Sequence, residues 1–134
     1  MTTDITATAQ AIAADIAAGK NFRPQDETAV GDIAWAYAVQ RAVAMELIHS
    51  GARTRIAGFK VALNSAALMQ HFGVSEPAAA HVFADEVHQS SARLDLSSYG
   101  SFLYEPEIAP VFDPALPSRQ NPYTQPEANP ATRR

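Results

Sequence analysis

The distribution of proline limits how much of this chain can fold into a compact core. Six of the nine prolines lie from Pro110 onward, and this stretch contains no glycine and few large apolar residues. Such a composition cannot bury enough apolar surface to offset the entropy lost when a chain is ordered. We therefore expect residues 113–134 to form a disordered tail, with the folded part of the chain ending near residue 112.

The remaining composition excludes several classes of protein. Apolar residues make up 47% of the 134 positions, which is enough for a core. No apolar run approaches the ~20 residues of a membrane span, and the N-terminus has no basic segment typical of a secretory signal. The chain has no cysteine and a net charge of −4, which argues against disulfides, thiolate sites and nucleic-acid binding. We expect a cytoplasmic protein that binds neither membranes nor nucleic acid.

Apolar residues recur at helical spacing twice within an N-terminal helical region, residues 1–54. The first pattern predicts a helix over 4–18, whose apolar side is formed by Ile5, Ala9, Ile12 and Ile16. The second predicts a longer helix over 32–50, ended by Gly51. Its expected buried stripe consists of Ile33, Tyr37, Ala44, Leu47 and Ile48.

Residues 55–63 change to the alternating period of a strand. One face of this strand, which we expect to lie in the core, consists of Ala57, Phe59, Val61 and Leu63. The opposite face consists of Ile56, Gly58, Lys60 and Ala62. A short helix capped by Asn64 or Ser65 should follow and end at Gly73. Further strands are expected over 82–87, 92–96 and 102–112, so that residues 55–112 form the sheet region.

Glu105 and Glu107 are the strongest candidates for metal ligands. On a strand over 102–112 both side chains point to one face, with their Cα atoms ~7 Å apart. Two carboxylates at that separation can converge on a divalent cation such as Mg²⁺, which prefers oxygen ligands. The alternative is a pair of solvated charges on an exposed face, and the spacing alone favours this alternative.

Lys60 and Asp85 are the other candidates for chemistry. Lys60 lies between two of the smallest side chains on its strand face, which leaves room for a ligand beside its ammonium. It could bind a carboxylate or transfer a proton, or it could simply extend to solvent from a half-exposed strand. Asp85 follows a predicted strand and could equally be a turn or capping residue.

Three motifs occur in a fixed order: Ala36-Tyr37-Ala38-Val39-Gln40, Gly58-Phe59-Lys60-Val61-Ala62-Leu63 and Glu105-Pro106-Glu107-Ile108-Ala109. Phe72-Gly73-Val74 and Val82-Phe83-Ala84-Asp85 lie between the second and third. In this order and spacing the chain resembles the 2-keto-4-pentenoate hydratase and 4-oxalocrotonate decarboxylase family of the fumarylacetoacetate hydrolase superfamily. The resemblance covers roughly residues 30 to 126.

The resemblance implies an α+β fold, in which N-terminal helices pack on the first strands of a mixed β-roll or distorted barrel of fumarylacetoacetate hydrolase type. It implies a Mg²⁺ or Mn²⁺ site with Glu105 and Glu107 as two of three carboxylate ligands. It also places Lys60 and Asp85 near the metal, in substrate orientation and proton transfer. Family members are about twice as long, and a later strand supplies the third carboxylate, so we expect a form that lacks the C-terminal half.

The implied function is a metal-dependent hydratase, a lyase acting on 2-hydroxy-2,4-dienoates or 2-keto-4-pentenoate in aromatic-compound catabolism, in a truncated form that is weakly active or inactive. One alternative is a decarboxylase of the 4-oxalocrotonate type. Another is a non-catalytic homologue that acts only as an oligomer partner, either of its own kind or of a pathway decarboxylase. An acylpyruvate hydrolase of the same superfamily is a further alternative, which the tyrosine–glutamine helix argues against.

Overall fold

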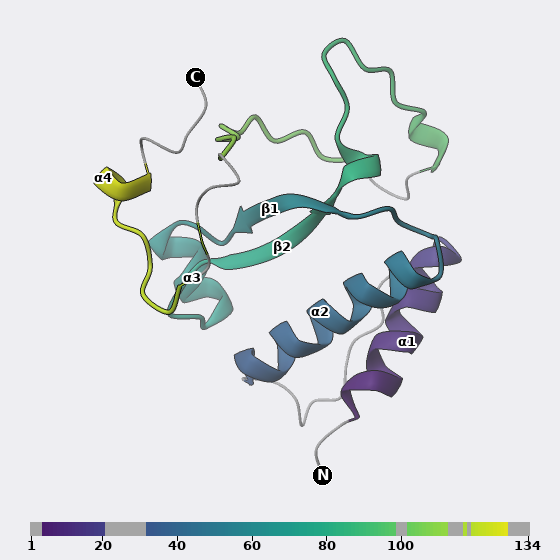
Figure 1. Ribbon diagram of the computed structural model, residues 1–134, viewed down its shortest axis with the longest axis horizontal. Helices are drawn as coiled ribbons and strands as arrows, with labels where there is room; N and C mark the ends of the chain where they lie inside the picture. Colours follow the sequence, from purple (N-terminus) through teal and green to yellow (C-terminus); the bar gives the residue numbers. More distant parts are fainter. Residues whose placement is uncertain (1–3, 21–31, 99–101, 113–116, 118, 129–134) are drawn as a thin grey trace. The chain divides into compact units, whose positions relative to one another are not determined.

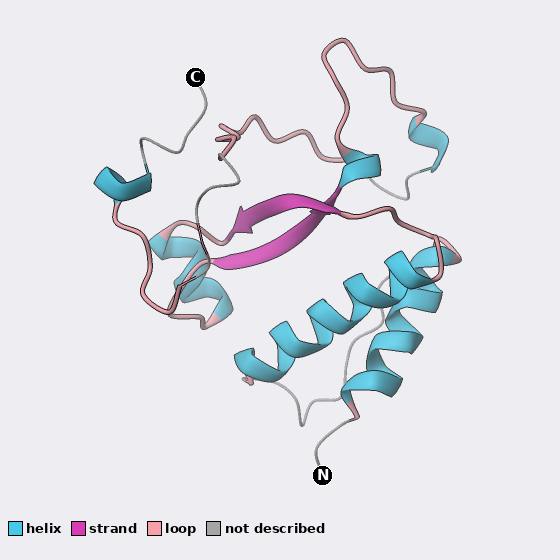
Figure 2. Cartoon of the chain, viewed as in Figure 1, coloured by secondary structure: helices cyan, strands magenta, loops and turns pink. Residues whose placement is uncertain are grey.

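The computed structural model describes residues 4–20, 32–98, 102–112, 117 and 119–128 (Figure 1). The chain divides into two compact units, Met1–Asp95 and Leu96–Arg134. The first unit contains helices and a two-stranded sheet, and the second contains only short helical turns among its described residues (Figure 2). The α+β class is therefore confirmed. The described residues show no barrel, and that part of the predicted fold remains a proposal.

Helix α1 spans Ile5–Ala17, and helix α2 spans Ile33–His49. An aspartate caps each start, because its short side chain can accept a free backbone N–H of the first turn. The Asp4 carboxylate accepts from the N–H of Thr6 at 2.9 Å, and the Asp32 carboxylate accepts from the N–H of Trp35 at 2.8 Å. The predicted bounds of both helices are confirmed to within one residue at each end.

Small residues form the contact between α1 and α2. Ala9 and Ala13 of α1 are 2% and 4% exposed. They belong to a core that also contains Val39, Val43, Ala44, Leu47 and Phe83. The stripe predicted for α1 was partly wrong, because Ile5 and Ile16 are 37% and 43% exposed. Alanine lets two helix backbones approach closely, and the larger isoleucines then lie beside the contact.

Strands β1, Ile56–Ala62, and β2, Ala78–Phe83, pair antiparallel. Helix α3, Ala66–Phe72, lies between them in sequence. The Ser65 hydroxyl caps α3 by accepting from the N–H of Leu68 at 3.2 Å. Gly73 ends the helix at φ +67°, a left-handed conformation in which glycine has no steric penalty. Both ends of the predicted short helix are thus confirmed.

The predicted faces of β1 have the expected members, but the expected orientation was wrong. Four partly buried residues alternate with exposed ones and form the more buried face: Ile56, which packs on the core, Gly58, Lys60 and Ala62. Ile56 lies opposite Phe83 and Gly58 lies opposite Val82, so a bulge inserts one extra residue between these two pairs. The face expected in the core is open, since Phe59 and Val61 are 68% and 50% exposed. Within the described residues, β2 is the only strand that pairs with β1.

The other predicted strands also differ from the structure. The second strand begins at Ala78 rather than residue 82, and it ends at Phe83 with one turn of 3-10 helix over Ala84–Glu86. Residues 92–96 and 102–112 form no regular strand, apart from an isolated bridge at Phe112. Two prolines in the latter segment lack the N–H that a ladder requires, which explains why the apolar pattern did not produce a strand.

None of the helices among the described residues combines the length and the apolar character needed to cross a bilayer.

Candidate functional site

Lys60 occupies the middle of β1, directly opposite Ala80 of β2. It is partly buried, and Gly58 and Ala62 share its face of the strand. Their partners across the sheet are Val82 and Ala78. The small neighbours predicted for Lys60, Gly58 and Ala62, are therefore present on its face of the strand.

Asp85 lies in the turn that follows β2, and Thr54 binds its carboxylate. Oδ1 accepts the Thr54 backbone N–H at 2.9 Å and the Thr54 hydroxyl at 2.8 Å. The guanidinium of Arg53 lies 3.6 Å from Oδ2. The two hydrogen bonds from Thr54, with a smaller effect of Arg53, hold the pKa of Asp85 below its usual range. Asp85 is thus a stably ionised carboxylate that joins the residues before β1 to the turn after β2.

Arg53 extends this cluster at the same end of the hairpin. Its Nη2 lies 3.2 Å from a carboxylate oxygen of Glu86, and its guanidinium lies 5.8 Å from the ring centre of Phe83. The Glu86 carboxylate also accepts the Phe83 N–H at 3.1 Å. Since these contacts join one end of β1 to one end of β2, the cluster fixes how the hairpin leaves the helices.

The structure does not bring Lys60 and Asp85 together. Lys60 lies opposite Ala80, whereas Asp85 lies beyond Phe83 on the same strand path. Three to five residues of strand rise separate the two positions by about 10 Å or more. Direct proton transfer between these two side chains would require a contact that this hairpin does not provide.

Glu105 and Glu107 lie in the second unit, within the extended segment 102–112, and both are exposed. Because this segment is not a regular strand, the predicted strand parity for the two side chains no longer applies. The described residues contain no group of three or more His, Cys, Asp or Glu side chains that could hold a metal ion. Lys60 belongs to the first unit, so the pairing of the glutamates with Lys60 is a proposal.

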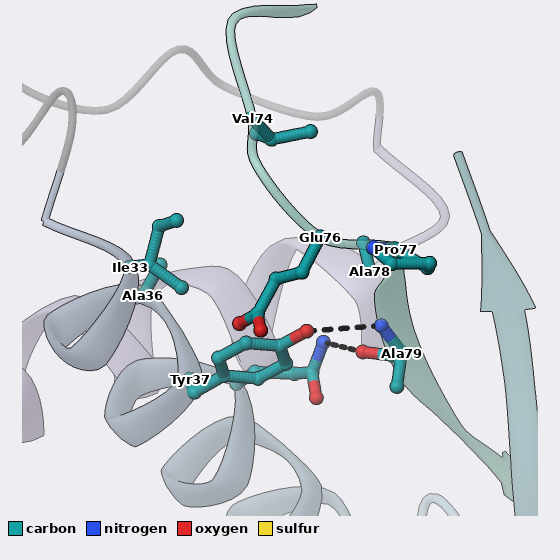
Figure 3. Close-up of a pocket in the computed structure, with 9 residues that line it drawn as sticks. Ile33, Ala36, Tyr37, Val74, Glu76, Pro77, Ala78 and Ala79 are labelled. Carbon is teal, nitrogen blue, oxygen red and sulfur yellow. Dashed lines mark hydrogen bonds between the residues drawn. The ribbon is translucent and has the colours of Figure 1, made fainter. Parts of the chain in front are cut away.

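A pocket of about 220 Å³ lies in the first unit, between α2 and the start of β2 (Figure 3). Its lining residues are Ile33, Ala36, Tyr37, Gln40, Val74, Glu76, Pro77, Ala78 and Ala79. No local sequence signal marks this pocket, because its walls come from segments that are adjacent only in the folded chain.

Tyr37 and Gln40 of α2 bind both backbone groups of Ala79 in β2. The Tyr37 hydroxyl oxygen accepts the Ala79 N–H at 3.0 Å, and Gln40 Nε2 donates to the Ala79 carbonyl at 2.9 Å. Residues three apart lie on one face of a helix, so this pair can reach the donor and the acceptor of a single residue. The pair therefore joins the backbone of β2 to α2 at this residue. Sequence reasoning placed Tyr37 in the core stripe and missed this role.

The second unit has a cluster of its own around Arg119. The guanidinium forms two bonds to the Glu127 carboxylate, at 3.0 and 2.8 Å, and lies 3.8 Å from the ring centre of Tyr123. It also donates to the carbonyls of Asn121 and Pro122. Glu127 belongs to a one-turn helix, α4, Gln125–Ala128, which has no buried residues. The disordered tail predicted over this segment did not include such a turn.

No protein-family model, curated protein or solved structure matches this chain. Any function assigned to it therefore depends on its motifs and on the geometry of its described residues.

Proposed function

We propose that the chain is a metal-dependent lyase of the 2-keto-4-pentenoate hydratase type. The observation that carries the proposal is the order of the Ala36–Gln40, Gly58–Leu63 and Glu105–Ala109 motifs. The hairpin geometry supports it, because the first two motifs lie in one packed arrangement. Tyr37 and Gln40 bind Ala79, the residue next to Ala80, and Ala80 is directly opposite Lys60. We likewise propose that the fold continues into the distorted barrel of this superfamily.

In this proposal Glu105 and Glu107 hold Mg²⁺ or Mn²⁺, with water completing the coordination. Their chemistry suits a hard cation, although the described residues provide no three-carboxylate cluster. A cation bound there would stabilise negative charge on the C2 oxygen of an oxo-acid or dienoate substrate. The Lys60 ammonium binds the substrate carboxylate, which is the interaction that its charge and its small neighbours allow. A proton-transfer role for Asp85 would require its carboxylate to leave Thr54 and the turn after β2 to move toward the substrate.

Two arguments support a weakly active or inactive form. A site made of Glu105 and Glu107 alone would bind a divalent cation less tightly than a site of three carboxylates, because fewer charges would compensate for the loss of its hydration shell. Asp85 already accepts two hydrogen bonds from Thr54, and its low pKa makes it a poor proton carrier near neutral pH. A productive site needs its groups within about 0.5 Å of the working geometry, so a carboxylate held by Thr54 would first have to move.

The second candidate function is that of a non-catalytic homologue that acts as an oligomer partner. The engagement of Asp85 by Thr54 and Arg53 favours it, because a structural ion pair replaces the proposed proton-transfer role. A decarboxylase would use the same residues as the hydratase, and only the reaction product distinguishes these two enzymes.

The test combines metal binding with turnover in the full chain. We expect weak Mn²⁺ binding by electron paramagnetic resonance, lost in the Glu105→Gln, Glu107→Gln double variant and retained in the Glu46→Gln control. Slow Mn²⁺-dependent loss of absorbance by 2-hydroxypenta-2,4-dienoate would support the hydratase, and CO₂ release from an oxalocrotonate would support the decarboxylase. Metal binding without turnover of either compound would support the non-catalytic homologue. Equal Mn²⁺ binding by the chain and the double variant would refute the proposed site.

A further inference from the structure

The pocket between α2 and β2 has an apolar wall and one charged side chain. Ile33, Ala36, Val74, Pro77 and Ala78 supply the apolar wall. Glu76 is the charged residue of the lining, and Figure 3 shows it reaching from the loop before β2 toward the ring of Tyr37. At about 220 Å³ the pocket is smaller than a typical drug-sized site of roughly 300–1,000 Å³, so it suits a ligand of small size.

The polar groups at the base of the pocket have defined roles. The Tyr37 oxygen accepts from Ala79, and the Gln40 amide nitrogen donates to the same residue. The bond to Ala79 holds the tyrosine hydroxyl, and the face of its ring attracts cations through its negative quadrupole. The Glu76 carboxylate adds a full negative charge at the mouth, where it is exposed. Both features favour a cation and oppose an anion.

The start of α2 would by itself favour an anion. The first turn of α2 lies beside the pocket, and the start of a helix carries partial positive charge. The carboxylate of Asp32 already neutralises this end, because it accepts the N–H of Trp35 at 2.8 Å. The negative charge of Glu76 therefore remains the dominant charge of the pocket lining.

We propose that this pocket is a binding site for a small primary amine with an apolar body. The ammonium group pairs with Glu76 near the ring of Tyr37, and the apolar body lies against Ile33, Val74 and Pro77. This site is separate from the proposed lyase chemistry, whose substrates are anions that Glu76 would repel. Its occupation does not depend on Glu105, Glu107 or a metal ion.

The test compares three ring compounds of nearly equal size that differ in charge: benzylamine, benzyl alcohol and benzoate. The full chain, labelled with ¹⁵N, is titrated with each in turn. We expect benzylamine to shift the amide signals of Tyr37 and Ala79 with a dissociation constant on the order of 1 mM, as is usual for so few atoms. Benzyl alcohol should bind about threefold more weakly, the usual effect of one exposed charge pair, and benzoate more weakly still.

Two variants locate the binding, and one serves as a control. Glu76→Gln should remove the preference for benzylamine over benzyl alcohol. Glu46→Gln makes the same charge change at a residue of α2 outside the pocket lining, and it should retain the preference. Ala36→Leu should fill the pocket and reduce binding of both compounds, in a helix that tolerates leucine. Equal affinity for all three compounds, tighter binding of benzoate, or the absence of shifts at Tyr37 and Ala79 would overturn the proposal.

Discussion

The helix pair and the hairpin of the first unit differ in which side chains they bury. In the pair, the buried positions include Ala9, Ala13 and Ala44, at 2–4% exposure. In the hairpin, Phe59 is 68% exposed, although it is one of the largest apolar side chains in the chain. Residue hydrophobicity alone would predict the reverse. The difference shows that burial in this protein depends on which surfaces have a partner.

Each helix of the pair has the other as its partner, since α1 and α2 pack against each other. The hairpin is joined to α2 at its β2 edge, through the bonds of Tyr37 and Gln40 to Ala79. Its core contact comes from Phe83 and Ile56 at one end. The stability of the first unit should therefore come mainly from the helices, with the hairpin contributing through few contacts.

The largest expected effect is the loss of a helix-pair side chain. Leu47→Ala removes a leucine that is 3% exposed and should lower the free energy of unfolding by about 2–5 kcal/mol, measured by urea denaturation. Met45→Ala on the same helix is the control, because Met45 is 56% exposed and should change stability little. Similar losses in both variants would show that the pair is not the stable part of the unit.

Removal of the bond between the helix and the hairpin should have a smaller effect. Tyr37→Phe deletes the acceptor of the Ala79 N–H and should cost about 1 kcal/mol. Hydrogen exchange should show faster exchange of the Ala79 amide with little change in α1. Unchanged protection of Ala79 would mean that this bond does not hold the hairpin to α2.

Changes to the open face of the hairpin should be smaller again. Phe59→Ser should alter the free energy of unfolding by no more than about 0.5 kcal/mol, because the ring is already largely in solvent. Thermal unfolding of the full chain measures the effect. A loss comparable to that of Leu47→Ala would show that another surface covers Phe59 in solution.

The smallest effect is local to the second unit and depends on pH. Hydrogen bonds from Arg119, together with those from Thr124, lower the pKa of Glu127 from 4.5 to about 2. Because the folded pKa is depressed, the stabilisation of this turn is present above the ordinary pKa and is lost as pH falls through about 2. The NMR signals of Tyr123 should therefore titrate near pH 2, and a midpoint near 4.5 would contradict the contact.

Local signals in the sequence predicted the helices well. The expected end of α2 at Gly51 and the expected boundaries of α3 at Ser65 and Gly73 agree with the structure, because capping depends on neighbouring residues alone. The same kind of signal was overlooked at Thr124, whose N–H and hydroxyl donate to Glu127 three residues later. A threonine followed by glutamate at this spacing is typical of a helix start.

Features that depend on distant contacts could not be predicted in this way. The bulge at Ile56 depends on the register with Phe83, and residues 78–80 are alanines, which have little intrinsic preference for strands. The candidate site also combines features that local sequence predicts with features that depend on distant contacts. The sequence correctly placed Lys60 on a strand among small neighbours, but the hydrogen bonds of Asp85 to Thr54 depend on a contact 31 residues apart.

The most direct test of the proposed function is paramagnetic broadening by Mn²⁺ in the NMR spectrum of the full chain. We expect Mn²⁺ held by Glu105 and Glu107 to broaden the signals of Lys60 and Ala80, since a substrate bridging metal and lysine requires a separation within ~12 Å. The Glu105→Gln, Glu107→Gln variant should show no such broadening. Broadening confined to residues 103–109, with sharp Lys60 signals, would contradict the proposal that these residues form one site.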